Sequence, residues 1–242
     1  PLLDSISKIT GGDGYSFIPD SSLLGNVFIH GISNFLTTAA SNVKLSVKLK
    51  RGVRFTDGTQ NKEVMINSLK YGQDKNLLFS IMGDDDHNDF AEILCEMNET
   101  ILRSDNVEVP ELNYYNEVLY RHKGIQIMND CLSLQKFNET EQVKHKINPF
   151  IESMKGDLSL KASKFIQDMV IDFEGQIKES LNMTGQGQRE DWYNKWGKHY
   201  LLSLSSAYSN ELCTNFKDKG ISHLGGELFH KLRDEVSDIF DS

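Results

Sequence analysis

The spacing of apolar residues changes partway along this chain, and that change limits the fold more than any other feature of the sequence. Between residues 43 and 49, apolar and polar residues alternate, which is typical of a strand with one buried face. After residue 89, apolar residues recur at intervals of three and four, which predicts helices. Strands and helices therefore occupy separate stretches, and we predict an α+β fold.

We predict an antiparallel β section over residues 42–83. It contains four short apolar segments, and Asp57 followed by Gly58 predicts one of the turns between them. The predicted strands are Val43 to Leu49, Val53 to Phe55, Val64 to Ile66, and Leu77 to Ile81. Short connections between successive strands favour an antiparallel sheet or a small sandwich.

Residues 84–242 are predicted to form a helical bundle. Apolar stripes at helical spacing cover most of this region. They run over residues 90–101, 115–128, 143–151, 165–177, 192–212 and 228–240. A connection that contains Gly185 and Gly187 separates the fourth stripe from the fifth.

Residues 1–41 follow a different order. We predict a helix, a short strand over Tyr15–Ile18, and a second helix whose apolar residues form one broad face between Leu24 and Leu36. One strand flanked by helices needs parallel neighbours, and this sequence offers none before it. We therefore expect residues 1–41 to pack against sequence outside this chain or against a partner chain. The start at Pro1 also suggests a piece of a longer protein.

Composition narrows the class of protein. The formal charge is −9, whereas a nucleic-acid-binding surface is normally basic. No run of about 18 apolar residues occurs, so we expect no membrane-spanning segment. Cys95, Cys131 and Cys213 are odd in number and far apart, which favours a reducing compartment, the cytoplasm, over a secreted disulfide scaffold.

The C-terminal stretch carries the most distinctive motifs. They are Lys195–Leu201 (KWGKHYL), Asn215–Asp218 (NFKD), and Gly225-Gly226 before Leu228. These motifs resemble the helical region, known as Vwaint, that lies beside von Willebrand factor A domains and Hedgehog/intein-like modules. The motif residues that we take as interaction candidates are Trp196, Gly197, His199, Tyr200, Asn215, Phe216, Asp218, Gly225 and Gly226.

Two further segments extend the resemblance. Gly11–Asp20 with Gly25–Ile29 resembles the last strand and helix of a von Willebrand factor A domain, and Leu69–Asp74 resembles the connection that follows such domains. The resemblance implies three parts. They are the C-terminal part of an A domain over residues 1–41, the antiparallel β section over 42–83, and a Vwaint-like helical bundle over 84–242.

The same resemblance limits the chemistry that we expect. An A domain usually binds a divalent cation through an Asp-x-Ser-x-Ser motif on its first strand. Hedgehog/intein-like modules process themselves with a nucleophilic cysteine or serine and a histidine. Neither the motif nor such a module lies within residues 1–242. We therefore expect no catalytic activity, no cofactor and no metal.

One polar cluster, Asp84-Asp85-Asp86-His87-Asn88-Asp89, could nevertheless hold calcium through its oxygens. Asp84, Asp85, Asp86 and Asp89 would be its ligands. An EF-hand loop that starts at Asp84 needs Gly and Glu at the positions where Asp89 and Cys95 stand. A solvated loop in which Asp89 caps the following helix is the favoured interpretation.

His199 and Cys213 each allow a catalytic interpretation. His199 could be a ligand or a general base, and Cys213 could pair with His199 or His223 as a nucleophile. However, Lys195 and Ser203, four residues either side of His199, are not a matching ligand set. Cys213 lies in an apolar helix face that offers nothing to lower its pKa. A packed histidine and a core cysteine are favoured.

The remaining motifs also have structural interpretations. Trp192, Trp196 and Tyr200 recur at helical spacing, which favours core over an aromatic binding patch. Residues 215–220 favour a corner between helices over a binding surface. Residues 11–14 favour a turn over a phosphate loop, because no Gly-Lys-Ser/Thr ending follows them.

Taken together, these features predict a non-catalytic protein-interaction or scaffolding segment of a larger multidomain protein. The expected partners are other proteins or the upstream part of the same protein, without nucleic acid or membrane. Two alternatives stay open: the spacer of an autoprocessing Hedgehog/intein-like precursor, or a regulatory part of a RING or U-box ubiquitin-ligase-like protein. The residues before Pro1 and after Ser242 would distinguish them.

Overall fold

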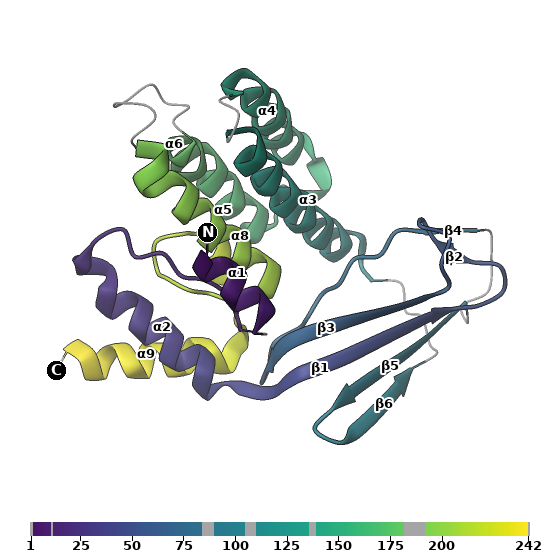
Figure 1. Ribbon diagram of the computed structural model, residues 1–242. Coiled ribbons are helices and arrows are strands. Elements are labelled where there is room, and N and C mark those ends of the chain that lie inside the picture. Colours follow the sequence, from purple (N-terminus) through teal and green to yellow (C-terminus); the bar gives the residue numbers. More distant parts are fainter. Residues whose placement is uncertain are drawn as a thin grey trace.

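The computed structural model describes residues 2–10, 12–83, 90–104, 110–135, 139–181 and 192–241. Its strands lie between residues 38 and 104, and its helices lie on either side of that stretch in the sequence. Figure 1 shows a bundle of helices from which a long sheet projects to one side. The predicted α+β class is therefore confirmed.

The main sheet has four antiparallel strands in the order β3-β1-β5-β6. Central strand β1 (Thr38–Leu49) pairs with β3 (Asn61–Lys70) on one side and with β5 (Ala91–Met97) on the other, and β6 (Thr100–Ser104) follows β5. Val43, Val47 and Leu49 of β1 are buried. The alternation in the sequence therefore predicted both the strand and its buried face.

A two-stranded sheet covers the far end of that buried face. It consists of β2 (Arg54–Phe55) and β4 (Ile81–Met82). Phe55 is buried against the ring of Phe79 at 5.7 Å. The predicted turn is confirmed, since Gly58 has a φ of 82° and Asp57 accepts a hydrogen bond from the Thr59 amide at 3.0 Å. The predicted strand over residues 77–81 is confirmed only at Ile81.

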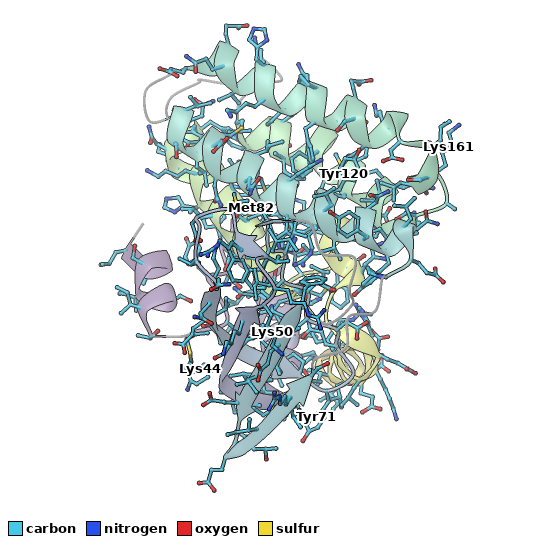
Figure 2. The ribbon with its side chains drawn as sticks, turned by 90° about the vertical axis from the view of Figure 1, so that its right-hand side faces the viewer. Lys44, Lys50, Tyr71, Met82, Tyr120 and Lys161 are labelled. Carbon is cyan, nitrogen blue, oxygen red and sulfur yellow. The ribbon has the colours of Figure 1, made fainter. Side chains whose placement is uncertain are left out.

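The opposite face of the main sheet is charged. Lys44 pairs with Glu63 at 2.7 Å, and Arg103 pairs with Glu92 at 2.8 Å. Figure 2 shows Lys44 and Lys50 on the sheet, with Tyr120 among the helices above it. One face therefore packs inward and the other is solvated, as in many antiparallel sheets.

The helix predicted over residues 90–101 is wrong. Strands β5 and β6 form a hairpin there, and Asn98 and Glu99 turn the chain with φ values of 46° and 65°. Apolar residues in this segment fit both a helical stripe and an alternating strand, because Ala91, Ile93 and Cys95 also recur at every second position. Those three residues pack on the two apolar clusters of the sheet. Pairing with β1 decides between the two patterns.

The strand predicted over Tyr15–Ile18 is also wrong. Residues 12–19, which we name the strap, form no strand in the described part of the chain, and they run between the sheet and the helices. The Phe17 amide donates to Ser203 Oγ at 3.1 Å, and Lys70 Nζ bonds to Asp13 Oδ2 at 2.6 Å. The strap therefore satisfies its polar groups with side chains instead of a neighbouring strand.

Helices α3, α4, α5 and α8 share one apolar core, and further helices lie at both ends of the chain. The bounds of all described helices are α1 Leu2–Ile9, α2 Leu24–Leu36, α3 Leu112–Gln135, α4 Thr140–Gly156, α5 Lys164–Asp172, α6 Lys178–Ser180, α8 Lys198–Asn210 and α9 Gly226–Asp241. Short segments flank them: η1 Ser21–Leu23, η2 Leu158–Leu160, η3 Phe173–Ile177, η4 Tyr193–Gly197 and η5 Gly220–His223. Fully buried members of the core include Met128, Ile147, Met169, Phe173, Leu201 and Tyr208.

A buried ion pair joins the sheet's connection to the bundle. Arg121 of α3 pairs with Glu211, and its Nη1 donates to the Tyr208 carbonyl at 2.7 Å. The Asn76 amide donates to Glu211 Oε1 at 3.0 Å, and the Asn76 carbonyl accepts from Arg121 Nη2 at 3.1 Å. Because each charge has several partners, the pair can be buried at a tolerable cost.

Candidate functional site

Four of the motif residues lie where η4 leads into α8. The rings of Trp196 and Tyr200 are stacked, with centroids 5.0 Å apart and planes within 7°. Gly197 is buried, and a Cβ at that position would overlap the Ser180 carbonyl oxygen at the end of α6. Only glycine therefore lets η4 lie this close to α6.

Both η3 and η4 are π-helical turns. Such turns are rare, and many of those known lie at functional sites. Gln176 of η3 and Trp196 of η4 line the same pocket. This irregular backbone therefore contributes to the hollow described below.

His199 packs as the sequence indicated. Its ring is stacked on Phe17 of the strap at 5.5 Å, and its Nδ1 lies 3.4 Å from Tyr15 Oη. Burial, with a smaller effect of the Lys198 charge, lowers its pKa. His199 therefore helps to hold the strap against α8.

The corner predicted over residues 215–220 is confirmed. Asn215 Oδ1 accepts hydrogen bonds from the amides of Lys217 at 2.8 Å and Asp218 at 2.9 Å. Asp218 is buried, and its carboxylate accepts from Tyr200 Oη at 2.6 Å and from Asn215 Nδ2 at 2.9 Å. Burial raises the pKa of Asp218, although the hydrogen bonds from Tyr200 and Asn215 oppose the shift.

A second buried carboxylate, Asp172, faces the same corner and was missed at the level of sequence. It accepts hydrogen bonds from the amides of Lys219 at 2.9 Å and Gly220 at 2.8 Å, and from Tyr208 Oη at 3.0 Å. Burial, and then the nearby charge of Asp218, raise the pKa of Asp172 to about 7. The available signal was a charged residue inside the apolar stripe of residues 165–177.

Neither of these two carboxylates forms an ion pair with a basic side chain in the described ranges. One turn earlier on α5, Asp168 differs in this respect, since it pairs with Lys164 at 2.9 Å and with His223 at 2.8 Å. Buried charges in proteins are normally paired. The Asp172–Asp218 pair therefore lacks an ion-pair partner among the described residues, although the nearby charge of Lys217 favours the ionised form of Asp218.

A pocket of about 40 Å³ lies beside Asp218, which is space for about three water molecules. The strap and the start of α2 form one wall, and the motif residues form the other. Its lining includes Phe17, Val27, Trp196, Tyr200, Lys217 and Asp218. The hollow therefore combines apolar and polar side chains, aromatic rings, one buried carboxylate and the charge of Lys217.

The other motif residues serve packing. Phe216 lies edge-on to the buried ring of His30 at 4.3 Å, and Arg233 lies 5.0 Å from its ring. Gly225 and Gly226 have φ values of 106° and 79°, which only glycine adopts at little cost. These residues set the geometry at the start of α9.

Cys213 and the candidate metal ligands have different outcomes. Cys213 is buried, and burial raises the pKa of its thiol to about 11, which leaves little nucleophilic thiolate. His223 bonds to Asp168.

Asp84, Asp85, Asp86 and Asp89 lie outside the described residues. Among the residues that the structure does describe, no three acidic, histidine or cysteine side chains group as metal ligands.

Helix α2 buries its polar face. His30, Ser33 and Thr37 are fully buried against the rest of the molecule, and α2 packs beside α9 (Figure 1). These side chains bond to carbonyls of their own helix: His30 Nδ1 to Asn26 at 2.8 Å, and Ser33 Oγ to Ile29 at 2.8 Å. No partner for His30 Nε2 or Asn34 Oδ1 exists within the described chain.

The outward face of α2 is apolar. Leu24, Phe28, Ile32, Phe35 and Leu36 are all exposed, Phe35 to 79%. No residue of α2 carries a formal charge when His30 is neutral. A face of this composition normally packs on a core.

Helix α1 has an exposed apolar face as well. Leu2, Leu3, Ile6 and Ile9 are exposed, Ile9 to 85%. In Figure 2 this helix stands away from the body of the molecule. No helix in the described ranges is long and apolar enough to cross a bilayer.

The fold is α+β, and its C-terminal helices match a family model, Vwaint, described as VWA / Hh protein intein-like, over residues 163–238. The match contains both buried carboxylates and every motif residue, and it covers just under a third of the chain. No curated protein and no solved structure matches the chain.

Proposed function

We propose that this chain is a non-catalytic protein-interaction segment whose contact surface is the outer face of α2, assisted by α1. The observation that carries the proposal is the inverted burial of α2, with polar side chains inside and five large apolar side chains outside. The proposal that the chain is a von Willebrand factor A-associated segment rests on the Vwaint match at residues 163–238.

The size of the exposed face indicates what kind of partner covers it. Together the five α2 side chains expose the equivalent of nearly three whole apolar side chains. Covering them would contribute about 4–8 kcal/mol. That is similar to the cost of bringing two free molecules together. The face therefore suits a neighbouring domain of the same polypeptide, which pays a much smaller entropic cost.

We therefore infer that the preferred partner is an upstream domain of the same polypeptide. The three cysteines are free thiols, which supports a reducing compartment such as the cytoplasm.

The test compares the 242-residue chain with a chain extended upstream through the adjoining domain. Hydrogen exchange should show protection of α2 only in the extended chain. Phe28→Glu and Phe35→Glu should destabilise the extended chain by about 1.5–3 kcal/mol each and change the 242-residue chain little.

Met65→Glu is the matched control, because Met65 is an equally exposed apolar residue on β3. It should change neither chain. Equal exchange of α2 in both chains, or equal effects of the three substitutions, would contradict the proposal.

A second function is favoured by the description of the matched family, which includes Hedgehog intein-like proteins. In that case the chain is the spacer ahead of a self-processing module. A full-length protein that is cut near residue 242, observed by immunoblotting with antibodies to each side, would support the spacer function. An uncut full-length protein would exclude it.

A further inference from the structure

We propose that the pocket beside Asp218 binds an alkylammonium group, with Trp196 and Phe17 around its carbon stem and the Asp218 carboxylate facing its charge. This site is distinct from the outer face of α2.

The first feature of the pocket is a buried carboxylate. Asp218 lines the pocket, and Asp172 lies close enough for the charge of Asp218 to raise the pKa of Asp172. Their hydrogen-bond donors are all neutral: two tyrosine hydroxyls, one side-chain amide and two backbone amides. No basic side chain in the described ranges forms an ion pair with either carboxylate, and a bound cation would form one with Asp218.

The walls select an organic cation. A metal ion prefers several oxygen, nitrogen or sulfur ligands, and no group of three acidic, histidine or cysteine side chains occurs in the described part of the chain. The pocket instead presents Phe17, Leu23, Val27 and Trp196. The Trp196 ring is stacked on Tyr200, so it serves together with Phe17 as an apolar wall. The apolar residues suit a hydrocarbon stem.

The volume selects a small group. About 40 Å³ accommodates an ammonium with the one or two methylenes next to it, such as the end of a lysine side chain or of a free primary amine. Lys217 also lines the pocket, and its charge opposes a cationic ligand. Removal of the Lys217 charge should therefore strengthen binding of a cation.

The test uses the 242-residue chain with Trp192→Phe, so that Trp196 is the one remaining tryptophan. n-Butylammonium should change its fluorescence in a saturable manner. n-Butanol, which has the same stem without the charge, and butyrate, which has the opposite charge, should not do so at the same concentrations.

Asp218→Asn should weaken binding of n-butylammonium at least about tenfold, because a charged hydrogen bond is lost. Asp168→Asn removes a buried carboxylate that does not line the pocket, and it should leave binding unchanged. Lys217→Gln should strengthen binding about two- to fivefold. The ligand comparison on unsubstituted Asp218 stands even if Asp218→Asn does not fold.

The source of the amine is resolved by adding a short lysine-containing peptide. Binding of the peptide identifies a protein side chain as the ligand, and binding of n-butylammonium alone identifies a free amine; both support the proposal. An equal response to n-butanol, weaker binding by Lys217→Gln, tighter binding of butyrate, or no response to n-butylammonium would each overturn it.

Discussion

The pH dependence of stability should have opposite signs at two aspartates one turn apart on α5. Burial and Asp218 raise the pKa of Asp172 to about 7 in the folded protein, from 3.8. The folded state therefore keeps a proton that the unfolded state has lost between pH 4 and 7, and the free energy of unfolding falls as pH rises through that window. Above pH 7 both states are ionised, and the loss is complete.

The magnitude follows from the two pKa values. Between pH 5 and pH 8 the contribution of Asp172 should fall by roughly 2 to 3 kcal/mol. Asp168 provides the contrast. Burial disfavours its charge, but hydrogen bonds from His223 and Lys164 outweigh burial, so that its pKa is lowered. Its contribution is present above about pH 4 and is lost as pH falls below that value.

The assay is urea unfolding at intervals between pH 4.5 and 8.5 for the parent chain, Asp172→Asn and Asp168→Asn. Subtracting the parent curve from each variant curve removes the titration of the other groups. Relative to the parent, Asp172→Asn should gain stability from pH 5 to pH 8, since its neutral amide does not ionise. Asp168→Asn should be less stable than the parent throughout this range.

Two results would refute this reasoning. If the difference between Asp172→Asn and the parent chain does not change with pH, Asp172 does not titrate in the assigned window. If the difference changes in the other direction, the carboxylate is stabilised as an anion, and its three hydrogen bonds outweigh burial.

Three further predictions concern packing and charge, each measured by urea unfolding. Gly197→Ala should cost about 2 kcal/mol, because the new methyl group overlaps the Ser180 carbonyl. Gly175→Ala meets open space in η3 and should be neutral or stabilise the protein by up to about 1 kcal/mol. Similar losses of stability at both sites would contradict the packing described. Arg121→Met should cost about 3–5 kcal/mol, because it leaves Glu211 buried without its counter-charge. Lys144→Met breaks an exposed ion pair and should cost under about 1 kcal/mol. A small loss of stability for Arg121→Met would mean that water reaches Glu211. Burial lowers the pKa of His30 to about 4, so the unfolded state binds a proton first as the pH falls. The free energy of unfolding should therefore fall by about 3 kcal/mol as pH drops from 6.5 to 4. His30→Leu should abolish this dependence, and a curve for the variant that runs parallel to that of the parent chain would disprove the prediction.

The sequence predicted the fold class and most helices because long periodic segments constrain structure strongly. The alternation at Val43, Val47 and Leu49 was sufficient for β1, and its partners followed. The segment over residues 90–101 was not decidable in this way, since both periods are present in it. Hydrogen bonds to β1, made with residues more than 40 positions away, decide that it is a hairpin.

The candidate site was predictable only in part. Motif residues Trp196, Tyr200, Asn215 and Asp218 do converge on one pocket wall. Asp172 could not be found from spacing, because its importance comes from donors 36 to 48 residues away in the sequence. The strap poses the same difficulty, as the partner of the Phe17 amide is a serine hydroxyl 186 residues further along.

Helix α2 shows most clearly where periodicity stops being informative. Its pattern identifies two faces, but it does not say which face meets the rest of this chain. Its buried polar residues tolerate burial because His30, Ser33 and Thr37 bond to carbonyls of their own helix and leave few groups unsatisfied. Phe28 and Phe35 on the exposed face cannot be stabilised by hydrogen bonds within the helix, since only removal from water stabilises an apolar side chain. The free energy still available to α2 therefore lies on its outer side, which is the physical reason for placing the proposed interface there.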